Sequence, residues 1–313
     1  MAQLEGFRVQ NYRSLRDVTI GRLYEPREGD KLTPLTAVIG KNGVGKSALF
    51  DAFGFIADCL TLDVETACDL KQRGGFERLR TAGRKGAIEF EICYRDDPKD
   101  RPIVYLLAVS CDSAGRPVIE KELLSSPDGG RATFMDLNHG AGTVSRGYVP
   151  FVDDFSSSGL VEKVALTDPR QLGIATLGTL RDHPRIGRFR DFLKGWYLSY
   201  FSPDAARGLP PTGPQKHLNV HGGNIANYVQ YLQRAHKDRL HSILNRIAEK
   251  IPGISRIDAV ETEDKRVLLR FNDRGFQDPF LCATNVRWHI EGLRLSLALG
   301  RPRPATVHLH RGA

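Results

Sequence analysis

The sequence predicts an α/β fold in which a strand, a glycine-rich loop and a helix follow one another near the N-terminus. Residues 35–39 form an apolar run that indicates a buried strand. Residues 40–47 contain three glycines, and residues 48–53 are typical of a helix that follows them. Polar and apolar residues alternate at residues 87–94 and 103–109, which predicts antiparallel strands. A chain of 313 residues can form one large α/β domain or two smaller ones.

The loop at residues 40–47 reads Gly-Lys-Asn-Gly-Val-Gly-Lys-Ser and fits the phosphate-binding pattern Gly-x4-Gly-Lys-Ser. Its glycines allow the backbone N–H groups to turn inward around an anion, and the following helix adds unpaired donors and the positive end of its dipole. In such a loop we expect Lys46 to be the catalytic residue that contacts the β- and γ-phosphates, and Ser47 to ligate Mg²⁺. The predicted cofactor-binding residues of the loop are Gly40, Lys41, Asn42, Gly43, Val44, Gly45, Lys46, Ser47 and Ala48.

Composition is consistent with a cytoplasmic protein that has a real core, since 41% of the residues are hydrophobic. No apolar run is long enough to span a membrane, and the N-terminus lacks the pattern of a signal peptide. The five cysteines are odd in number and scattered, which argues against a disulfide framework and a zinc site. Half of the net charge of +8 comes from residues 282–313, so charge alone does not predict DNA binding.

The elements before and after the loop follow from local patterns. Two short strands are predicted at residues 7–10 and 17–20, joined by a turn at residues 11–16. The helix that starts after Gly45 is expected to end near Leu60.

The later part of the chain starts with a further strand of the antiparallel sheet at residues 118–124, and residues 125–160 are rich in Gly, Ser and Asp and predict loops. Apolar residues at three-four spacing from Ile225 to Ile251 then predict one amphipathic helix. It has few acids and several basic residues, among them Arg234, Lys237, Arg239 and Arg246. We interpret them as a solvated face of a core helix, in preference to a DNA contact. Two strands are expected after the helix, at residues 255–260 and 266–271.

The segment Phe-Arg-Val-Gln-Asn-Tyr-Arg-Ser-Leu-Arg-Asp-Val at residues 7–18 resembles the opening of RecF-like and SMC-like ABC-type ATPases. In that family an Asn-aromatic-Arg-Ser turn precedes a Gly-x-Asn-Gly-x-Gly-Lys-Ser loop, and residues 40–47 match that loop. The resemblance is strong at residues 5–55. It implies a P-loop NTPase fold of ABC/RecF type, with a mixed sheet, an antiparallel β subdomain and a helical insertion.

The resemblance implies the following organisation. An ATPase head would cover residues 1–281, with an N-terminal β/P-loop lobe at about 1–125, a loop-rich and helical part at about 126–254, and returning strands at about 255–281. ATP and Mg²⁺ would be the cofactors, and two heads would form a homodimer through their nucleotide faces. Arg13 would contact a phosphate as the matching arginine does in the family, although a surface arginine in a turn is an equal interpretation.

Three elements that this family needs are missing after the returning strands. They are a signature motif, a hydrophobic strand that ends in paired acids, and a histidine switch. Residues 282–313 contain none of them, and Glu291 is the only acid after Asp278. We therefore expect the C-terminal part of the core to be missing, residues 282–313 to be an aberrant, disordered tail, and ATP turnover by this chain to be low.

A change of reading frame would account for the tail. The codons of Trp288 and His289, read one base later, give Gly, and the adjacent triplets permit Asp before it and Thr after it. Residues 301–313 can shift in the same way to Asp-Pro-Ala-Pro-Pro-Pro and then Phe-Ile-Cys-Ile-Glu-Glu-Pro. The hypothesis is that the chain is out of frame from about residue 282. The alternative is a divergent C-terminal extension.

The leading functional interpretation is the ATP-binding head of an RecF/SMC-like ATPase. Intact relatives would couple hydrolysis to DNA repair or to defence against foreign DNA, with DNA or a nuclease as partner by analogy alone. A non-catalytic nucleotide-binding or interaction module is the alternative. A P-loop kinase or GTPase fits less well, because the chain has no Asn-Lys-x-Asp motif to recognise guanine.

Other polar residues are weaker candidates. Three glutamines are candidates for the family's Mg²⁺-contacting residue, and the sequence does not choose among Gln72, Gln171 and Gln277. His217 and His221 lack a carboxylate or cysteine that would complete a metal site, so we interpret them as solvated loop residues. Asp153 and Asp154 form an acid pair in a Ser-rich segment and are a poor substitute for the missing acids.

Overall fold

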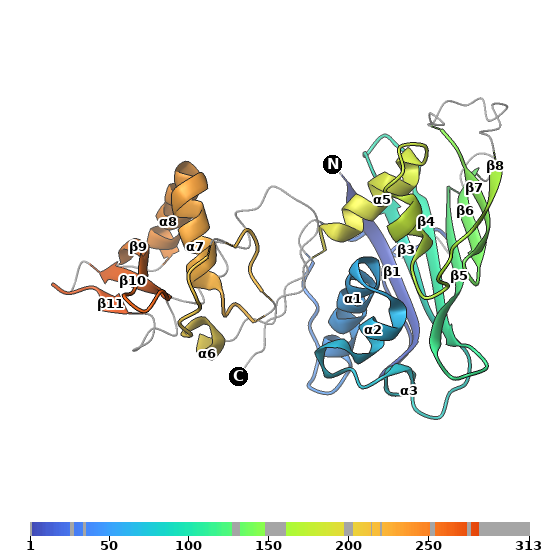
Figure 1. Cartoon of the computed structure of the whole chain (residues 1–313), viewed down its shortest axis with the longest axis horizontal. Coiled ribbons are helices and arrows are strands. Elements are labelled where there is room, and N and C mark those ends of the chain that lie inside the picture. Colours follow the sequence, from blue (N-terminus) through green and yellow to red (C-terminus); the bar gives the residue numbers. More distant parts are fainter. Residues whose placement is uncertain are drawn as a thin grey trace. The chain divides into compact units, whose positions relative to one another are not determined.

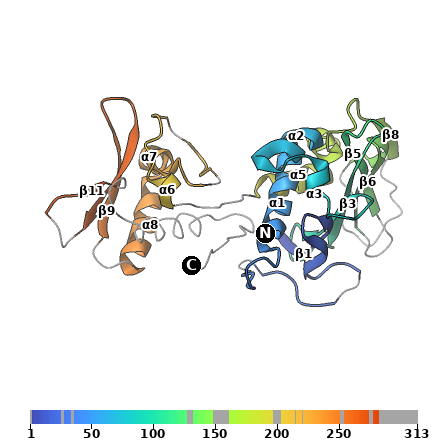
Figure 2. The same cartoon turned by 90° about the horizontal axis from the view of Figure 1, so that it is seen from below.

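The structure is a computed structural model that describes residues 2–25, 28–33, 36–126, 132–147, 161–196, 203–213, 215–219, 221–250, 254–273 and 277–281. The chain forms two compact units that divide between Leu198 and Ser199. We describe each unit by itself (Figures 1 and 2). Unit 1 contains the glycine-rich loop, and unit 2 contains the amphipathic helical segment predicted after residue 224.

Unit 1 is built on an eight-stranded sheet with the order β2-β1-β3-β4-β5-β6-β7-β8, in which every neighbouring pair is antiparallel. The strands are β1 (Gln3–Tyr12), β2 (Leu15–Gly21), β3 (Ile88–Arg95), β4 (Ile103–Cys111), β5 (Pro117–Ser126), β6 (Ala132–Asn138), β7 (Ala141–Ser145) and β8 (Val161–Ala165). The predicted antiparallel subdomain is therefore confirmed, whereas the described strands of this unit form no mixed sheet.

The predicted strands before residue 125 are confirmed with one exception, the strand at residues 35–39. Residues 36–39 belong to no strand, and the side chain of Ile39 is 93% exposed. Among the described residues no strand pairs with this segment, and a lone extended segment without a partner does not satisfy its backbone groups. The prediction of loops throughout residues 125–160 is also wrong, because β6 and β7 lie there and continue the ladder from β5.

The helices of unit 1 are α1 (Lys46–Thr61), α2 (Val64–Asp69), the short 3₁₀ helix η1 (Leu70–Gln72), α3 (Phe76–Leu79), α4 (Gly173–Leu177) and α5 (Pro184–Lys194). The predicted helix after the loop is confirmed by α1. Figures 1 and 2 show α1, α2 and α5 on the same side of the sheet. This side carries the core, because α1 buries most of its residues and presents aromatic side chains to the sheet.

Aromatic packing fixes α1 against the sheet. The ring of Phe53 on α1 stacks on Phe7 of β1, with 4.1 Å between the ring centroids. Trp196 packs edge-on against Phe53 at 4.9 Å. The opposite face of the same strands is polar, with Arg8 of β1 paired to Asp17 of β2 at 2.7 Å. This alternation along β1 places the apolar face, and not the polar one, against the helix that begins at the loop.

Unit 2 combines α6 (Pro203–Ala206), α7 (Ile225–Ala235) and α8 (Lys237–Lys250) with a three-stranded antiparallel sheet of β9 (Ile254–Glu261), β10 (Val267–Asp273) and β11 (Phe280–Leu281). The strands predicted at residues 255–260 and 266–271 are confirmed by β9 and β10. The prediction of a single long helix is wrong, because His236 leaves the helical conformation (φ −145°, ψ 56°) between α7 and α8. The apolar spacing does not reveal this break, since Leu232 and Leu240 stay buried on both sides of it.

Across the described residues, the helices are too short or too polar for any of them to cross a bilayer.

Candidate functional site

The glycine-rich loop lies at the N-terminus of α1 and depends on two glycines. Gly43 (φ 83°) and Gly45 (φ 96°) adopt left-handed conformations that other residues rarely take. Gly45 is also in close contact with the turn between β1 and β2. A Cβ added to Gly45 would lie 2.8 Å from Cδ2 of Leu15 and 3.1 Å from Oγ of Ser14. The glycine therefore allows the β1–β2 turn to pack directly on the loop.

Lys46 folds back over the loop that precedes it. Its Nζ donates hydrogen bonds to the carbonyl oxygens of Gly40, at 2.5 Å, and of Lys41, at 2.7 Å. These contacts hold the ammonium group above the first residues of the loop. The other predicted loop residues vary in exposure: Lys41, Asn42, Gly43, Val44 and Ser47 are exposed, Gly45 is half-buried, and Ala48 is buried.

The start of α1 fits an anion. The N-cap residue, Gly45, has no side chain to accept from the amides of the first turn, and that turn contains no acidic residue. The positive end of the helix is therefore not neutralised by the helix's own side chains. A phosphate group with negative charge and acceptor oxygens matches these donors. Ser47, an exposed residue, carries a hydroxyl oxygen of the kind that Mg²⁺ prefers as a ligand.

The end of β1 and the turn that follows it hold two non-glycine residues in left-handed backbone conformations, Asn11 (φ 59°) and Arg13 (φ 50°). Such residues are uncommon and persist where the surroundings fix them. Here Nδ2 of Asn11 donates to the carbonyl oxygen of Ala87 at 2.9 Å, and the amide of Arg13 donates to that of Leu79 at 2.5 Å. The turn is therefore held rigidly beside the loop.

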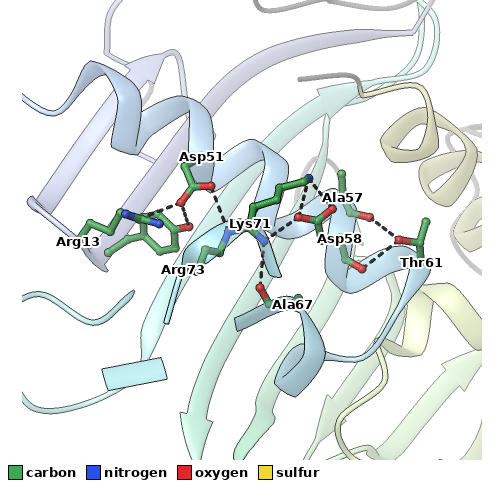
Figure 3. A network of polar contacts seen from close by, with 9 residues as sticks. Arg13, Asp51, Ala57, Asp58, Thr61, Ala67, Lys71 and Arg73 are labelled. Carbon is green, nitrogen blue, oxygen red and sulfur yellow. Dashed lines mark hydrogen bonds and ion pairs between the residues drawn. The ribbon is translucent and has the colours of Figure 1, made fainter. Parts of the chain in front are cut away.

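Asp51, on the second helical turn of α1, joins the β1–β2 turn to this helix (Figure 3). Its Oδ2 atom accepts a hydrogen bond from the hydroxyl group of Tyr12 at 2.7 Å and lies 2.8 Å from Nε of Arg13. Its Oδ1 atom accepts from Nε of Arg73 at 3.1 Å. Burial, together with the negative charge of Asp51, raises the pKa of Tyr12 well above its usual value. Tyr12 therefore stays protonated and remains a donor.

Arg73 continues the network from Asp51 to Asp58, two turns further along α1 (Figure 3). Its Nη1 atom donates to Asp58 at 2.6 Å and to the carbonyl oxygen of Ala67 at 2.9 Å. Lys71 also donates to Asp58, at 2.8 Å. The side chain of Arg73 is 0% exposed and lies over the ring of Phe55. Although burial lowers the pKa of Arg73, the two carboxylates raise it, so the guanidinium remains charged.

The sequence reasoning missed this network. Asp51 and Asp58 are separated by seven residues in a mostly apolar helix, which places them on one face and was a usable signal. No pattern in the sequence identifies Arg73 as their partner, because it comes from a separate segment after α2.

The weaker candidates are not gathered at the loop by any described contact. Gln72 is exposed beside Arg73, Gln171 is exposed elsewhere in unit 1, and Gln277 is exposed in unit 2. His217 and His221 lie in unit 2, and the described residues contain no cluster of three metal-ligating side chains. The acid pair at 153–154 and the predicted tail at 282–313 lie outside the described residues.

Comparison with known proteins gives one family. The sequence matches the family described as “AAA domain, putative AbiEii toxin, Type IV TA system” over residues 35–292. The matched stretch contains the whole glycine-rich loop and α1, and its end falls inside the segment predicted as an aberrant tail. No curated protein matches the chain.

Proposed function

The chain belongs to this AAA-domain family, a family of P-loop ATPases, and we propose that residues 40–47 bind Mg²⁺-ATP. The observation that carries the proposal is the loop geometry. Gly43 and Gly45 adopt conformations that turn the backbone around an anion, and Lys46 holds its ammonium group above the loop at the uncapped start of α1.

Each residue has a distinct role in the proposed site. The amides of the loop hold the phosphate oxygens, Lys46 neutralises the β- and γ-phosphates, and Ser47 contributes a ligand to Mg²⁺. Arg13, in the turn packed on Gly45, contacts a phosphate. The bond to be cleaved would lie in the bound Mg²⁺-ATP, and the loop and the β1–β2 turn would hold the nucleotide in place.

At a finer level we propose an RecF/SMC-like head of ABC type. The support is the segment at residues 7–18, which forms the end of β1, the turn and the start of β2 and approaches Gly45 of the loop through Ser14 and Leu15. Two heads would pair through their nucleotide faces as a homodimer, in a process that acts on DNA, either repair or defence. The family description names a type IV toxin–antitoxin system, and such a system is a further biological process in which a role of this ATPase can be tested.

Calorimetric titration of the full-length chain with Mg²⁺-ATP tests the binding proposal. We expect saturable binding to the native chain and a loss of about a hundredfold or more in Lys46→Ala, because a charged contact to phosphate is removed. Competition by GTP separates an ATPase from a GTPase. Equal affinities of the native chain and Lys46→Ala, or a preference for GTP, contradict the proposal.

Hydrolysis depends on groups that we propose to be encoded in the shifted frame. Resequencing the gene around the codons for residues 280–285, and expressing the restored chain, tests this. We expect the restored chain to hydrolyse ATP and the chain as written to bind ATP with little turnover. Robust turnover by the chain as written rules out the frame hypothesis, whereas binding without turnover in both chains favours a non-catalytic module.

A further inference from the structure

The ion-pair network beside the loop is built on the aspartates of α1, with Arg13 and Arg73 as partners. Asp51 lies four residues after Ser47 on α1, so the two side chains share one face of the helix, about 6 Å apart. The carboxylate that binds Arg13 is therefore one turn from the hydroxyl group that the proposed function assigns to Mg²⁺. The same helix face then continues through Phe55 to Asp58, along the path that Arg73 covers.

Arg13 and Arg73 bind Asp51 in different ways. Arg73 is fully buried and is fixed by both aspartates, whereas the side chain of Arg13 is 36% exposed and meets Asp51 through Nε. A guanidinium whose Nε forms an ion pair with a carboxylate keeps the edge formed by its two Nη groups for another acceptor. The backbone of Arg13 is also held in a left-handed conformation by the bond from its amide to Leu79. Arg13 is thus held by its backbone and by the ion pair between its Nε and Asp51, next to the loop.

We propose that Asp51 and Arg73 are positioning residues that orient Arg13 toward the phosphates of the nucleotide. Arg73, held by Asp58 and Ala67, fixes the carboxylate of Asp51. Asp51 in turn fixes the plane of the Arg13 guanidinium so that its Nη edge faces the anion at the start of α1. This inference rests on the proposed function, since it needs a phosphate at the loop.

The charges of the network support this arrangement. Arg13 and Arg73 both pair with Asp51, so this carboxylate and its two partners carry one net positive charge beside a site for a strongly negative ligand. The hydroxyl group of Tyr12 occupies a further acceptor site on Asp51 and carries no charge. Asp51 is therefore fully neutralised and does not repel the phosphates, although it lies one turn from them.

The test measures Mg²⁺-ATP affinity by calorimetry in full-length variants. We expect Arg13→Ala to weaken binding about tenfold, and Asp51→Asn to weaken it by a similar factor, because each removes a charge-assisted contact. The double variant is expected to bind like Arg13→Ala alone, since Asp51 acts through Arg13. Arg13→Lys should not restore binding, because a lysine ammonium group lacks the planar fork with which a guanidinium contacts Asp51 on one side and a phosphate on the other.

Lys71→Met is the matched control. It removes a cation from the same network, but among the described residues the side chain of Lys71 bonds to Asp58 and not to Asp51 or Arg13. We expect its ATP affinity to equal that of the native chain. Unfolding curves of every variant, measured without nucleotide, separate a loss of folding from a loss of affinity.

The outcomes distinguish the two proposals. If the native chain binds ATP and Lys46→Ala does not, the proposed function stands, and the remaining variants test only the positioning role. Native affinity in Asp51→Asn overturns that role, and so does a loss in the double variant that equals the sum of the single losses. Tighter binding in Asp51→Asn also overturns it, because Asp51 would then compete with the phosphates for Arg13.

Discussion

Single residues determine whether the loop can form beside the β1–β2 turn. Gly45 has a left-handed backbone and no room for a Cβ, whereas Gly43 has a left-handed backbone and open space around it. A substitution at Gly43 therefore introduces backbone strain alone, whereas a substitution at Gly45 introduces both backbone strain and a steric clash. The sequence pattern identified both as loop residues, but it did not distinguish them, because the neighbours of Gly45 come from a turn thirty residues earlier in the chain.

Gly45→Ala is expected to destabilise unit 1 more than Gly43→Ala. Gly43→Ala should cost about 1 kcal/mol, from backbone strain alone. Gly45→Ala adds a clash with Leu15 and Ser14 and should cost about 3 kcal/mol in total. Urea unfolding followed by the fluorescence of Trp196, with Trp288 replaced by Phe, measures both. Equal losses in the two variants would show that the turn does not pack on Gly45.

Glu122 is a buried carboxylate that was not recognised in the sequence. It accepts hydrogen bonds from the amides of Gly173 and Ile174 at the start of α4 and from the hydroxyl group of Tyr105. Complete burial raises the pKa of Glu122 from 4.5 to about 7, although these three donors lower it. The folded state therefore binds a proton more tightly than the unfolded state.

The stability of unit 1 should fall as the pH rises through this range. The contribution of Glu122 is fully present below pH 4.5 and is lost as the pH passes about 7, since the folded pKa is the higher one. The change amounts to about 3 kcal/mol. Urea unfolding at a series of pH values should show this decrease in the native chain relative to Glu122→Gln, which cannot titrate. Parallel pH profiles of the two proteins contradict the assignment.

Among the elements, α1 connects the core to the site. One side packs aromatic residues on the sheet, and another carries Asp51 and Asp58 toward Arg73. The periodicity of the sequence predicted the helix and its limits well, because local spacing determines both. It failed at residues 36–39 and at His236, where the outcome depends on a partner strand and on one backbone conformation. Strand pairing and side-chain partners that are distant in the sequence leave no local pattern.

Arg73 joins α1 to α2, because it bonds to Asp51 and Asp58 on α1 and to Ala67 on α2. Arg73→Met leaves two carboxylates without their buried partner and should lower the free energy of unfolding by about 3 kcal/mol. Lys71→Met removes a half-exposed ion pair with Asp58 and should change it by about 0–1 kcal/mol. Urea unfolding of the two variants measures the difference. Similar small effects in both would show that the buried network contributes little to stability.

At the scale of the whole molecule, the nucleotide site lies in unit 1, and every described contact of its proposed residues is made within that unit. The loop, its helix and its flanking turn were predictable from short motifs. The predicted tail lies outside the described residues, and the encoding of the groups for hydrolysis in the shifted frame is part of the proposed function. The family match across residues 35–292 establishes the P-loop ATPase class. Binding at the loop is therefore the central claim.

Hydrogen–deuterium exchange of the full-length chain, with and without Mg²⁺-ATP, tests that claim most directly, because it locates the amides that hold the ligand. The account predicts slower exchange in peptides that cover residues 40–49 when ATP is present, and no such change in Lys46→Ala. Exchange at residues 40–49 that is the same with and without saturating ATP, or protection that persists in Lys46→Ala, would contradict it.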